Sequence, residues 1–338
     1  MDKIEIKGYK SFKDLKLELK PINILIGANG SGKSNFLSFF EFLNRLYEQK
    51  LTEYVALGGG IDKYFFQGSK VTDAIYAKID FVDNFYLFEL KEGDNRFVVS
   101  QEGLGYHNNY YDIAQFRNEA NIKPYDGLLR GSYIKKYLSE IKKYHFHDTG
   151  KSSPFTKESH IVNDVYYLYE KGENIAAFLY AIRQNEPVVY KRIVRVIQSI
   201  APYFSDFYFN VSAANTVRLQ WTDKFCSTIY GPTDLSDGTI RFIALTTLFL
   251  QPVPPKVIII DEPELGLHPL AIQKLAGMIK SAAAKGTQVI VATQSADLIS
   301  NFDAEDIITI NQTEGASVMN RLSSEELNTW LESYFRRL

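Results

Sequence analysis

The segment INILIGANGSGKS, residues 22–34, constrains the fold of this chain more than any other stretch. Its first five residues form a short apolar run that ends at a glycine, which predicts a buried strand. The residues after Lys33, SNFLSFFEFLNRLYEQ, carry apolar side chains at helical spacing. A glycine-rich loop ending in Lys-Ser, between a strand and a helix, matches the P-loop pattern at every fixed position. The sequence therefore predicts an α/β protein with a phosphate-binding loop.

The residue types in this loop suit the phosphates of a nucleotide such as ATP. Glycines allow consecutive main-chain N–H groups to line a concave surface around a phosphate. We expect Lys33 to neutralise the β- and γ-phosphate oxygens and the Ser34 hydroxyl to coordinate Mg²⁺. The predicted nucleotide-binding residues of the loop are Asn29, Gly30, Ser31, Gly32, Lys33, Ser34 and Asn35.

A second motif, KVIIIDEP at residues 256–263, carries two adjacent carboxylates. Its apolar residues predict a strand that delivers Asp261 to its carboxyl end, beside the P-loop, where the side chain can hold the magnesium shell. Glu262 follows at once and can orient or deprotonate the attacking water. We therefore predict Asp261 as a metal-site residue and Glu262 as the catalytic base.

The remaining pattern predicts a P-loop head with a mostly parallel core sheet, an antiparallel β layer and a helical insertion. Residues 3–8, 14–19 and 73–101 alternate apolar and polar side chains, which is typical of antiparallel strands. Apolar strands are expected at 256–260, 288–292 and 305–311, and helices at 130–143, 174–184, 187–200, 238–250, 269–285 and 324–335. We predict three segments, namely 1–103 as the first part of the head, 104–203 as the insertion and 204–338 as the second part.

Composition limits the location and the partners of the protein. The formal net charge is −2, so the chain has no overall basic character that would indicate nucleic-acid binding. The single cysteine, Cys226, excludes an internal disulfide, and its aromatic and apolar sequence neighbours predict a buried thiol. Neither an apolar leader nor a run of 18 apolar residues is present. These features predict a cytoplasmic protein without a membrane segment.

One local basic stripe stands out within the helix predicted at 130–143. Its lysines recur at a seven-residue interval on one face, and they are Lys135, Lys136, Lys142 and Lys143. A solvated helix face explains this pattern, and contact with a DNA phosphate backbone is the alternative.

Six stretches make a family resemblance specific. LSDGT at 235–239 looks like the ABC-ATPase signature and lies just before the strand of the second motif. GYKSFKD at 8–14, GANGSGKSN at 27–35 and DEPELGLHP at 261–269 resemble the SMC/RecF branch of these ATPases and the ATPase half of OLD-type nucleases. HFHDT (145–149) and VATQS (291–295) are similar to segments of small stand-alone bacterial AAA-family ATPases described as RecF-like. The motifs extend from residue 8 to residue 295 and so cover most of the chain.

The resemblance implies that the signature acts in trans. Two ABC heads meet head-to-tail, and the signature of each contacts the γ-phosphate held by the other. One P-loop and one LSDGT per chain then imply a homodimer, in which Ser236, Asp237 and Gly238 read the partner's ATP. Relatives also place a basic residue near the phosphates where this chain has Lys10, although a solvated lysine is an equal alternative.

Two positions depart from the family pattern. Gln294 stands where ABC ATPases usually have a histidine that touches the γ-phosphate. Because glutamine donates a hydrogen bond but cannot become cationic, we count Gln294 as catalytic and expect slow hydrolysis. His268 occupies the place of an interfacial aspartate in many ABC proteins. It either reaches across a dimer interface or caps the helix that begins at Pro269.

The segment that senses the nucleotide has two candidates. Gln67 precedes the alternating strands, whereas relatives have a glutamine loop after them. HFHDT lies in the expected place, and strand alternation puts His145 and His147 on one face and Phe146 on the other. Asp148 can then approach Mg²⁺ or the water. Ordinary packing and turn formation is the alternative role of this segment, and an independent metal site is a third.

The sequence thus predicts an ATPase that uses ATP and Mg²⁺ and forms an ATP-dependent homodimer. RecF-like action on DNA in repair or genome maintenance is the first expectation for its role. A regulatory module that controls a separately encoded effector, such as a nuclease in a defence system, is the alternative. A transporter motor is the third expectation, because the motifs resemble the SMC/RecF type and this resemblance argues against a transporter.

Overall fold

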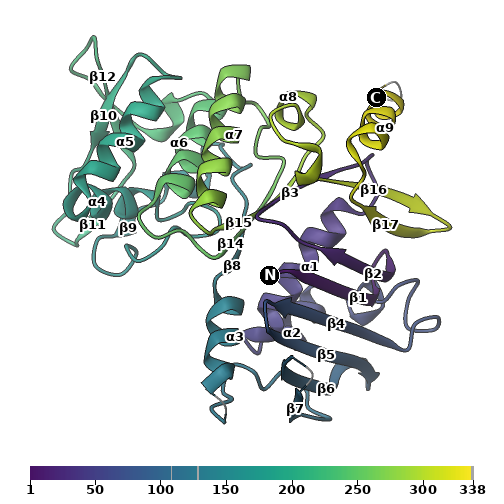
Figure 1. Cartoon of the computed structure of the whole chain (residues 1–338). Helices are drawn as coiled ribbons and strands as arrows, with labels where there is room; N and C mark the ends of the chain where they lie inside the picture. The colour runs from purple at the N-terminus through teal and green to yellow at the C-terminus, as the bar shows by residue number, and fades with distance from the viewer. Residues whose placement is uncertain (108, 128, 336–338) are drawn as a thin grey trace. The chain divides into compact units, whose positions relative to one another are not determined.

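The computed structural model describes residues 1–107, 109–127 and 129–335. The chain divides into two compact units (Figure 1). Unit 1 joins the two ends of the chain, Met1–Lys142 and Asp303–Leu338, and unit 2 comprises Lys143–Phe302. The three-segment division predicted from the sequence stays a prediction. In the described ranges, no helix is long and apolar enough to cross a membrane.

An antiparallel sheet makes up much of unit 1. Its strands follow the order β2-β1-β4-β5-β6-β7. They are β1 (Lys3–Tyr9), β2 (Phe12–Glu18), β4 (Ala74–Phe81), β5 (Asn84–Gly93), β6 (Arg96–Tyr106) and β7 (Asn109–Ala114). Alternate residues of β1 and β4 are buried, and Ile4 pairs with Ile79 across the two strands. This alternation, predicted from the sequence, gives the sheet one core-facing side.

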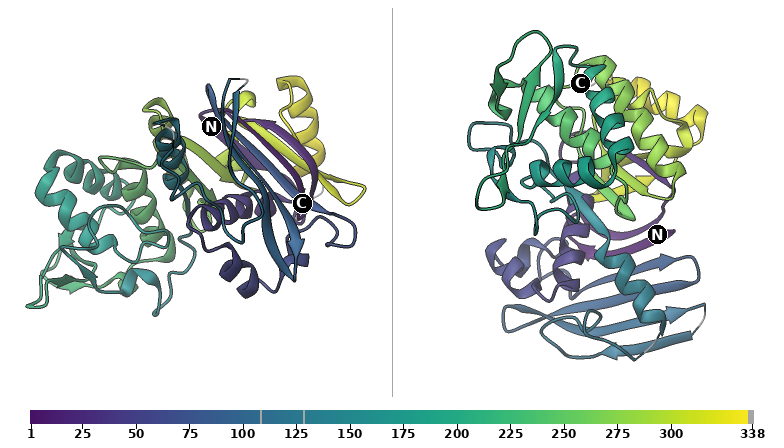
Figure 2. Two further views of the ribbon diagram at one scale, coloured as in Figure 1. Left: turned by 90° about the horizontal axis from the view of Figure 1, so that it is seen from below. Right: turned by 90° about the vertical axis from the view of Figure 1, so that its left-hand side faces the viewer.

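The helix that follows the P-loop packs on that side of the sheet. Helix α1 (Lys33–Tyr47) buries a row of phenylalanines, and Phe39 stacks on Phe88 of β5 with ring centroids 6.5 Å apart. Helices α2 (Leu51–Leu57) and α3 (Leu129–Ser139) and the short turn η1 (Ile61–Lys63) complete this part of unit 1. Figure 2 shows the twisted sheet with the purple helices on one of its faces.

The last residues of the chain return to the strand of the P-loop. Strand β3 (Ile22–Ile26) pairs in parallel with β16 (Ile307–Thr313), which in turn pairs antiparallel with β17 (Ala316–Asn320). The turn η4 (Ala304–Asp306) precedes β16, and helix α9 (Ser324–Phe335) follows β17. Every residue of β3 is buried, as the apolar run predicts.

Unit 2 is built around a pair of parallel strands. Strands β14 (Val257–Asp261) and β15 (Gln288–Ala292) are buried except at Asp261. Their helices are α6 (Asp237–Leu250), α7 (Pro269–Ala284) and α8 (Ala296–Ile299). Helices α4 (Ile175–Asn185) and α5 (Pro187–Gln198) precede them, with turns η2 (Pro154–Thr156) and η3 (Pro232–Asp234). Short antiparallel strands complete the unit: β9 (Ser159–His160), β10 (Phe204–Tyr208), β11 (Thr216–Val217), β12 (Gln220–Asp223) and β13 (Ile229–Tyr230).

Two local expectations are wrong. The helix predicted at 130–143 ends at Ser139, and the chain continues as strand β8 (Ile141–Tyr144), in which Ile141 and Tyr144 are buried. Lys142 and Lys143 therefore lie on a strand and do not share a helix face with Lys135 and Lys136. The Cys226 thiol is exposed, because the segment around it lies on the surface.

Candidate functional site

The P-loop of unit 1 has a conformation that requires glycine. Gly30 has φ +80° and Gly32 has φ +115°, values that residues with a Cβ rarely adopt. A Cβ on Gly32 would lie 2.1 Å from the Ser317 hydroxyl oxygen, and a Cβ on Gly27 would lie 2.4 Å from the Ile310 carbonyl oxygen. Gly27 and Gly32 therefore also allow a close approach of the C-terminal hairpin.

Two buried polar groups of this loop fit a bound phosphate. The Ser31 hydroxyl is buried and has no hydrogen-bond partner. Lys33 is only 6% exposed, and its Nζ donates to the carbonyl oxygens of Gly27 at 2.5 Å and Ala28 at 3.0 Å. A buried hydroxyl without a partner and a buried ammonium are costly unless a ligand uses them, and an anion would satisfy both. The loop tip, residues 28–30, is exposed to solvent.

A cavity of about 510 Å³ adjoins the first turn of α1 in unit 1. Its lining includes three residues singled out from the sequence, Lys10, Asn35 and Gln67. Lys10 is held in place, since its Nζ donates to Ser38 Oγ at 2.8 Å and lies 5.3 Å from the centre of the Tyr64 ring. The cavity is also lined by Ser11, Gly58, Lys63, Tyr64, Phe65, Phe66 and Gly315.

In unit 2, the two predicted carboxylates lie at the end of β14. Glu262 has φ +41°, an unfavourable conformation for a residue with a side chain, and its N–H donates to the Ala292 carbonyl at 2.8 Å. Gln294 Nε2 donates to Glu262 Oε1 at 2.8 Å. His147 Nε2 donates to the main-chain carbonyl of Asp261 at 2.9 Å. Both predicted carboxylate positions are thus held by side chains from other segments.

A third acidic residue of this motif, Glu264, is not predicted from the sequence. Glu264 is 8% exposed, and Thr293 Oγ1 donates to its Oε1. Its other oxygen is buried without a hydrogen-bond partner. Burial raises the pKa of the Glu264 carboxyl above its ordinary value of 4.5. In the sequence, Glu264 is simply the third acidic residue of DEPE. Nothing in this pattern distinguishes a buried glutamate from a solvated one.

The signature residues begin helix α6. Ser236 is the N-cap, and its hydroxyl accepts the Thr239 N–H at 3.2 Å. Asp237 is exposed and accepts the Thr149 hydroxyl at 2.8 Å. A Cβ on Gly238 would lie 2.2 Å from the Gly266 carbonyl oxygen. Within this chain, Gly238 therefore permits close packing against the segment that follows Glu264.

HFHDT connects the signature helix to the acidic motif within unit 2. The rings of His145 and His147 lie 4.5 Å apart and Phe146 is buried, which confirms that the two histidines share a face, although strand β8 ends at Tyr144 and the segment itself is not a strand. Asp148 Oδ1 accepts the Gly150 N–H at 3.3 Å, a turn contact. No group of three or more metal-ligating side chains was found in the part of the chain that the structure describes.

Arg241, on α6, is a residue that the sequence did not reveal. Its guanidinium donates to the carbonyls of Phe146 at 3.2 Å and His147 at 3.0 Å, and to the carbonyl of Leu265. His268 is exposed and its Nδ1 accepts the Leu270 N–H at 3.3 Å, which is the capping role left open above.

Comparisons with known proteins agree with this arrangement. Residues 1–186, more than half of the chain, match the family model described as "AAA ATPase domain". Residues 227–300 match a second model, described as "AAA domain, putative AbiEii toxin, Type IV TA system".

Two curated relatives match shorter segments. The energy-coupling factor transporter ATP-binding protein EcfA2 of Lactobacillus delbrueckii subsp. bulgaricus is 26% identical over 136 residues, which are 38% of this chain and 45% of that protein. The Old nuclease of Escherichia phage P2 is 32% identical over 77 residues, 23% of this chain and 13% of the nuclease. The chain thus spans less than half the length of either relative.

Solved SMC heads share the fold. A SmcHead bound to the C-winged helix domain of ScpA superposes with a TM-score of 0.65 at 18% identity, over 97% of this chain and 99% of that one. The Pyrococcus furiosus Smc head gives 0.57 at 18% identity, covering 98% of each chain. The Thermotoga maritima SMC head gives 0.51 at 15% identity, over 95% of this chain and 98% of that one. The chain belongs to the AAA ATPase domain family, and its fold is that of the SMC heads.

Proposed function

We propose that this protein binds ATP with Mg²⁺ and hydrolyses it slowly. The observation that carries the proposal is the P-loop, in which the Lys33 ammonium and the unpartnered Ser31 hydroxyl are both buried. Lys33 and the loop amides bind the phosphates. Ser34 and Asp261 are the residues that would hold Mg²⁺, which when bound offsets negative charge on the phosphate oxygens.

The nucleoside part of ATP would occupy the 510 Å³ cavity of unit 1. Asn35 lines this cavity and follows Ser34 directly, so a nucleotide held by the loop lies next to the cavity. Aromatic Tyr64 and the polar side chains of Lys63 and Gln67 offer the mixed lining that nucleosides require. The ordered position of Lys10 supports a role near the nucleotide rather than a solvated one.

Glu262 is the proposed general base. It would orient the attacking water and accept its proton, while Gln294 keeps the carboxylate in place through the 2.8 Å hydrogen bond. Because Gln294 carries no charge, it adds less stabilisation to a developing phosphate charge than a cationic histidine would. Slow hydrolysis follows from this difference.

We further propose that the active form is a head-to-tail homodimer in the cytoplasm. The exposure of Ser236, Asp237 and His268 supports this, since a partner could reach all three. The SMC-like fold and the ABC-type signature support the same assembly.

Mixing two inactive variants tests the homodimer. Lys33→Ala removes a chain's own ATP site, and Ser236→Arg blocks only its signature. A mixed dimer contains one intact composite site, whereas each homodimer contains none. Mixing should therefore restore ATPase activity, up to about half of wild type per dimer, with any cooperativity lowering this figure. A pull-down should first show that mixed dimers form. If their ATPase activity then stays at background, the two sites do not act independently in trans.

For the biological role, we propose two candidates, RecF-like action on DNA first and ATP-dependent control of a separate effector second. The separation of Lys142 and Lys143 from the face of α3 weakens the DNA proposal. The similarity of short segments to a toxin-system AAA domain and to the phage P2 Old nuclease favours the second.

DNA binding decides between these roles. ATP-dependent binding should fall steeply with salt and weaken when Lys135, Lys136, Lys142 and Lys143 are changed to Gln, while ATP binding stays intact. If wild type binds no DNA at low salt in the presence of ATP, the effector role becomes the preferred one.

A further inference from the structure

The C-terminal segment of unit 1 holds main-chain carbonyls of the P-loop. The Tyr334 hydroxyl, on α9, donates to the Gly27 carbonyl at 3.2 Å, and this contact is buried. Ser317, on β17, donates from its hydroxyl to the Ser31 carbonyl at 2.6 Å. Residues about 300 positions apart in the sequence thus fix the loop that the glycines shape.

The Gly27 carbonyl has a second donor, the Lys33 ammonium at 2.5 Å. If Lys33 binds the β- and γ-phosphates as proposed, two of its three N–H donors turn to phosphate oxygens, so it must release at least one of the Gly27 and Ala28 carbonyls. Gly27 is buried, so a carbonyl that lost every donor would oppose binding. Tyr334 can prevent this loss because it contacts the carbonyl independently of Lys33.

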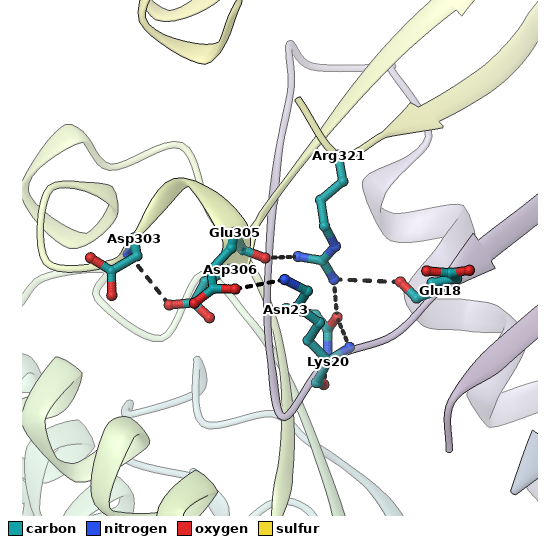
Figure 3. A network of polar contacts seen from close by, with 7 residues as sticks. All are labelled: Glu18, Lys20, Asn23, Asp303, Glu305, Asp306 and Arg321. Carbon is teal, nitrogen blue, oxygen red and sulfur yellow. Dashed lines mark hydrogen bonds and ion pairs between the residues drawn. The ribbon is translucent and has the colours of Figure 1, made fainter. Parts of the chain in front are cut away.

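The Tyr334 hydroxyl is well fixed relative to the loop. Its side chain is 7% exposed, and its ring stacks on Trp330 with centroids 4.8 Å apart. Figure 3 shows how the same C-terminal segment is tied to the start of β3. Arg321 donates to Asn23 Oδ1 at 2.6 Å and to the Glu305 carbonyl. Since β3 ends directly before Gly27, this network anchors the segment to the strand that carries the loop.

We propose that Tyr334 is a positioning residue for nucleotide binding. Its hydroxyl keeps the Gly27 carbonyl hydrogen-bonded while the Lys33 ammonium moves from this carbonyl to the phosphates. Tyr334 acts through the loop's main chain. This inference rests on the proposed binding of nucleotide at the P-loop.

Nucleotide affinity provides the first test. Titration of a fluorescent ADP analogue should show about three- to tenfold weaker binding by Tyr334→Phe, the size expected for one hydrogen bond. Tyr110→Phe is the matched control. It removes a tyrosine hydroxyl that bonds Gln101 and Asp112 on the antiparallel sheet, and it should change the affinity by less than about twofold.

Thermal unfolding without nucleotide provides the second test. In the wild-type background, Tyr334→Phe leaves Lys33 bonded to Gly27, so the melting temperature should change little. In a Lys33→Ala background the carbonyl loses both donors, and the same change should lower the melting temperature by about 2 °C more. If the hydroxyl had only a structural role, Tyr334→Phe would lower the melting temperature equally in both backgrounds and leave the nucleotide affinity unchanged.

The outcomes separate this inference from the proposed function. Wild-type protein that binds no nucleotide would overturn both. Wild-type protein that binds ADP, with unchanged affinity in Tyr334→Phe or equal melting shifts in the two backgrounds, would overturn the role of Tyr334 alone.

Discussion

The P-loop of unit 1 and the acidic motif of unit 2 are held in place by different physical means. The P-loop depends on main-chain conformation, with Gly30 and Gly32 at positive φ and carbonyls held by Lys33, Ser317 and Tyr334. In the acidic motif, side chains from other segments contact both residues, Gln294 at the Glu262 carboxylate and His147 at the main-chain carbonyl of Asp261.

This difference has consequences for mutation. A loop that offers many N–H groups to a phosphate should fail mainly when its backbone can no longer adopt the conformation. A carboxylate oriented by side chains should respond separately to the loss of each of these contacts. Its proton-accepting chemistry can also be removed without disturbing the fold.

Removal of the base should give the largest effect. Glu262→Gln keeps the size of the side chain and the possibility of a hydrogen bond to Gln294, but it cannot accept a proton. Steady-state ATPase turnover should fall by roughly two orders of magnitude or more, with ATP affinity retained. Light scattering should also show the ATP-bound dimer accumulating. Turnover within a few-fold of wild type would remove Glu262 from this role.

Two glycine substitutions sharpen the statement about the P-loop. Gly30→Ala meets nothing within 4 Å and carries only the cost of positive φ, about 1 kcal/mol. Gly32→Ala carries that cost and also meets the Ser317 hydroxyl, so we expect about 3 kcal/mol. Denaturant unfolding of the two variants measures the difference. Equal losses would mean that the C-terminal hairpin moves aside easily.

Gln294 tests whether the base depends on its neighbour. Gln294→Ala removes the donor to Glu262 and should lower turnover about tenfold, with ATP affinity within about twofold of wild type. Gln294→His should retain more activity, because an imidazole N–H can also donate. If Gln294→Ala lowers affinity and leaves turnover unchanged, the residue contacts the nucleotide instead of orienting the base.

Glu264 should give the smallest effect, visible as a pH dependence of stability. Burial raises its pKa in the folded protein, so the unfolded chain releases this proton at lower pH than the folded chain. Stability due to the protonated form is therefore lost as pH rises from about 4.5 through the raised folded pKa. Melting temperatures across this range should show wild type losing stability relative to Glu264→Gln. Parallel curves would contradict a raised pKa.

Several features of the fold and site could be predicted locally. The helices at 174–184, 187–200, 238–250, 269–285 and 324–335 were placed to within about two residues, because apolar spacing and caps act over a few residues. The helix at 130–143 was not, since its end depends on burying Ile141 and Tyr144 in a strand. Strands β7 and β17 were missed for a similar reason, because both pair with neighbouring strands at the edge of a sheet.

The sequence by itself determined the P-loop, the apolar strands around it and the family, because glycine, lysine and apolar residues impose their requirements on immediate neighbours. Only the tertiary structure decided which distant residues complete these elements. Tyr334 and Ser317 reach the loop from the far end of the chain, and Arg241 joins HFHDT to the segment after Glu264. A tyrosine, serine or arginine has the same local pattern whether it is solvated or bonded to a distant carbonyl. Its role is therefore set by chain folding and cannot be read from spacing.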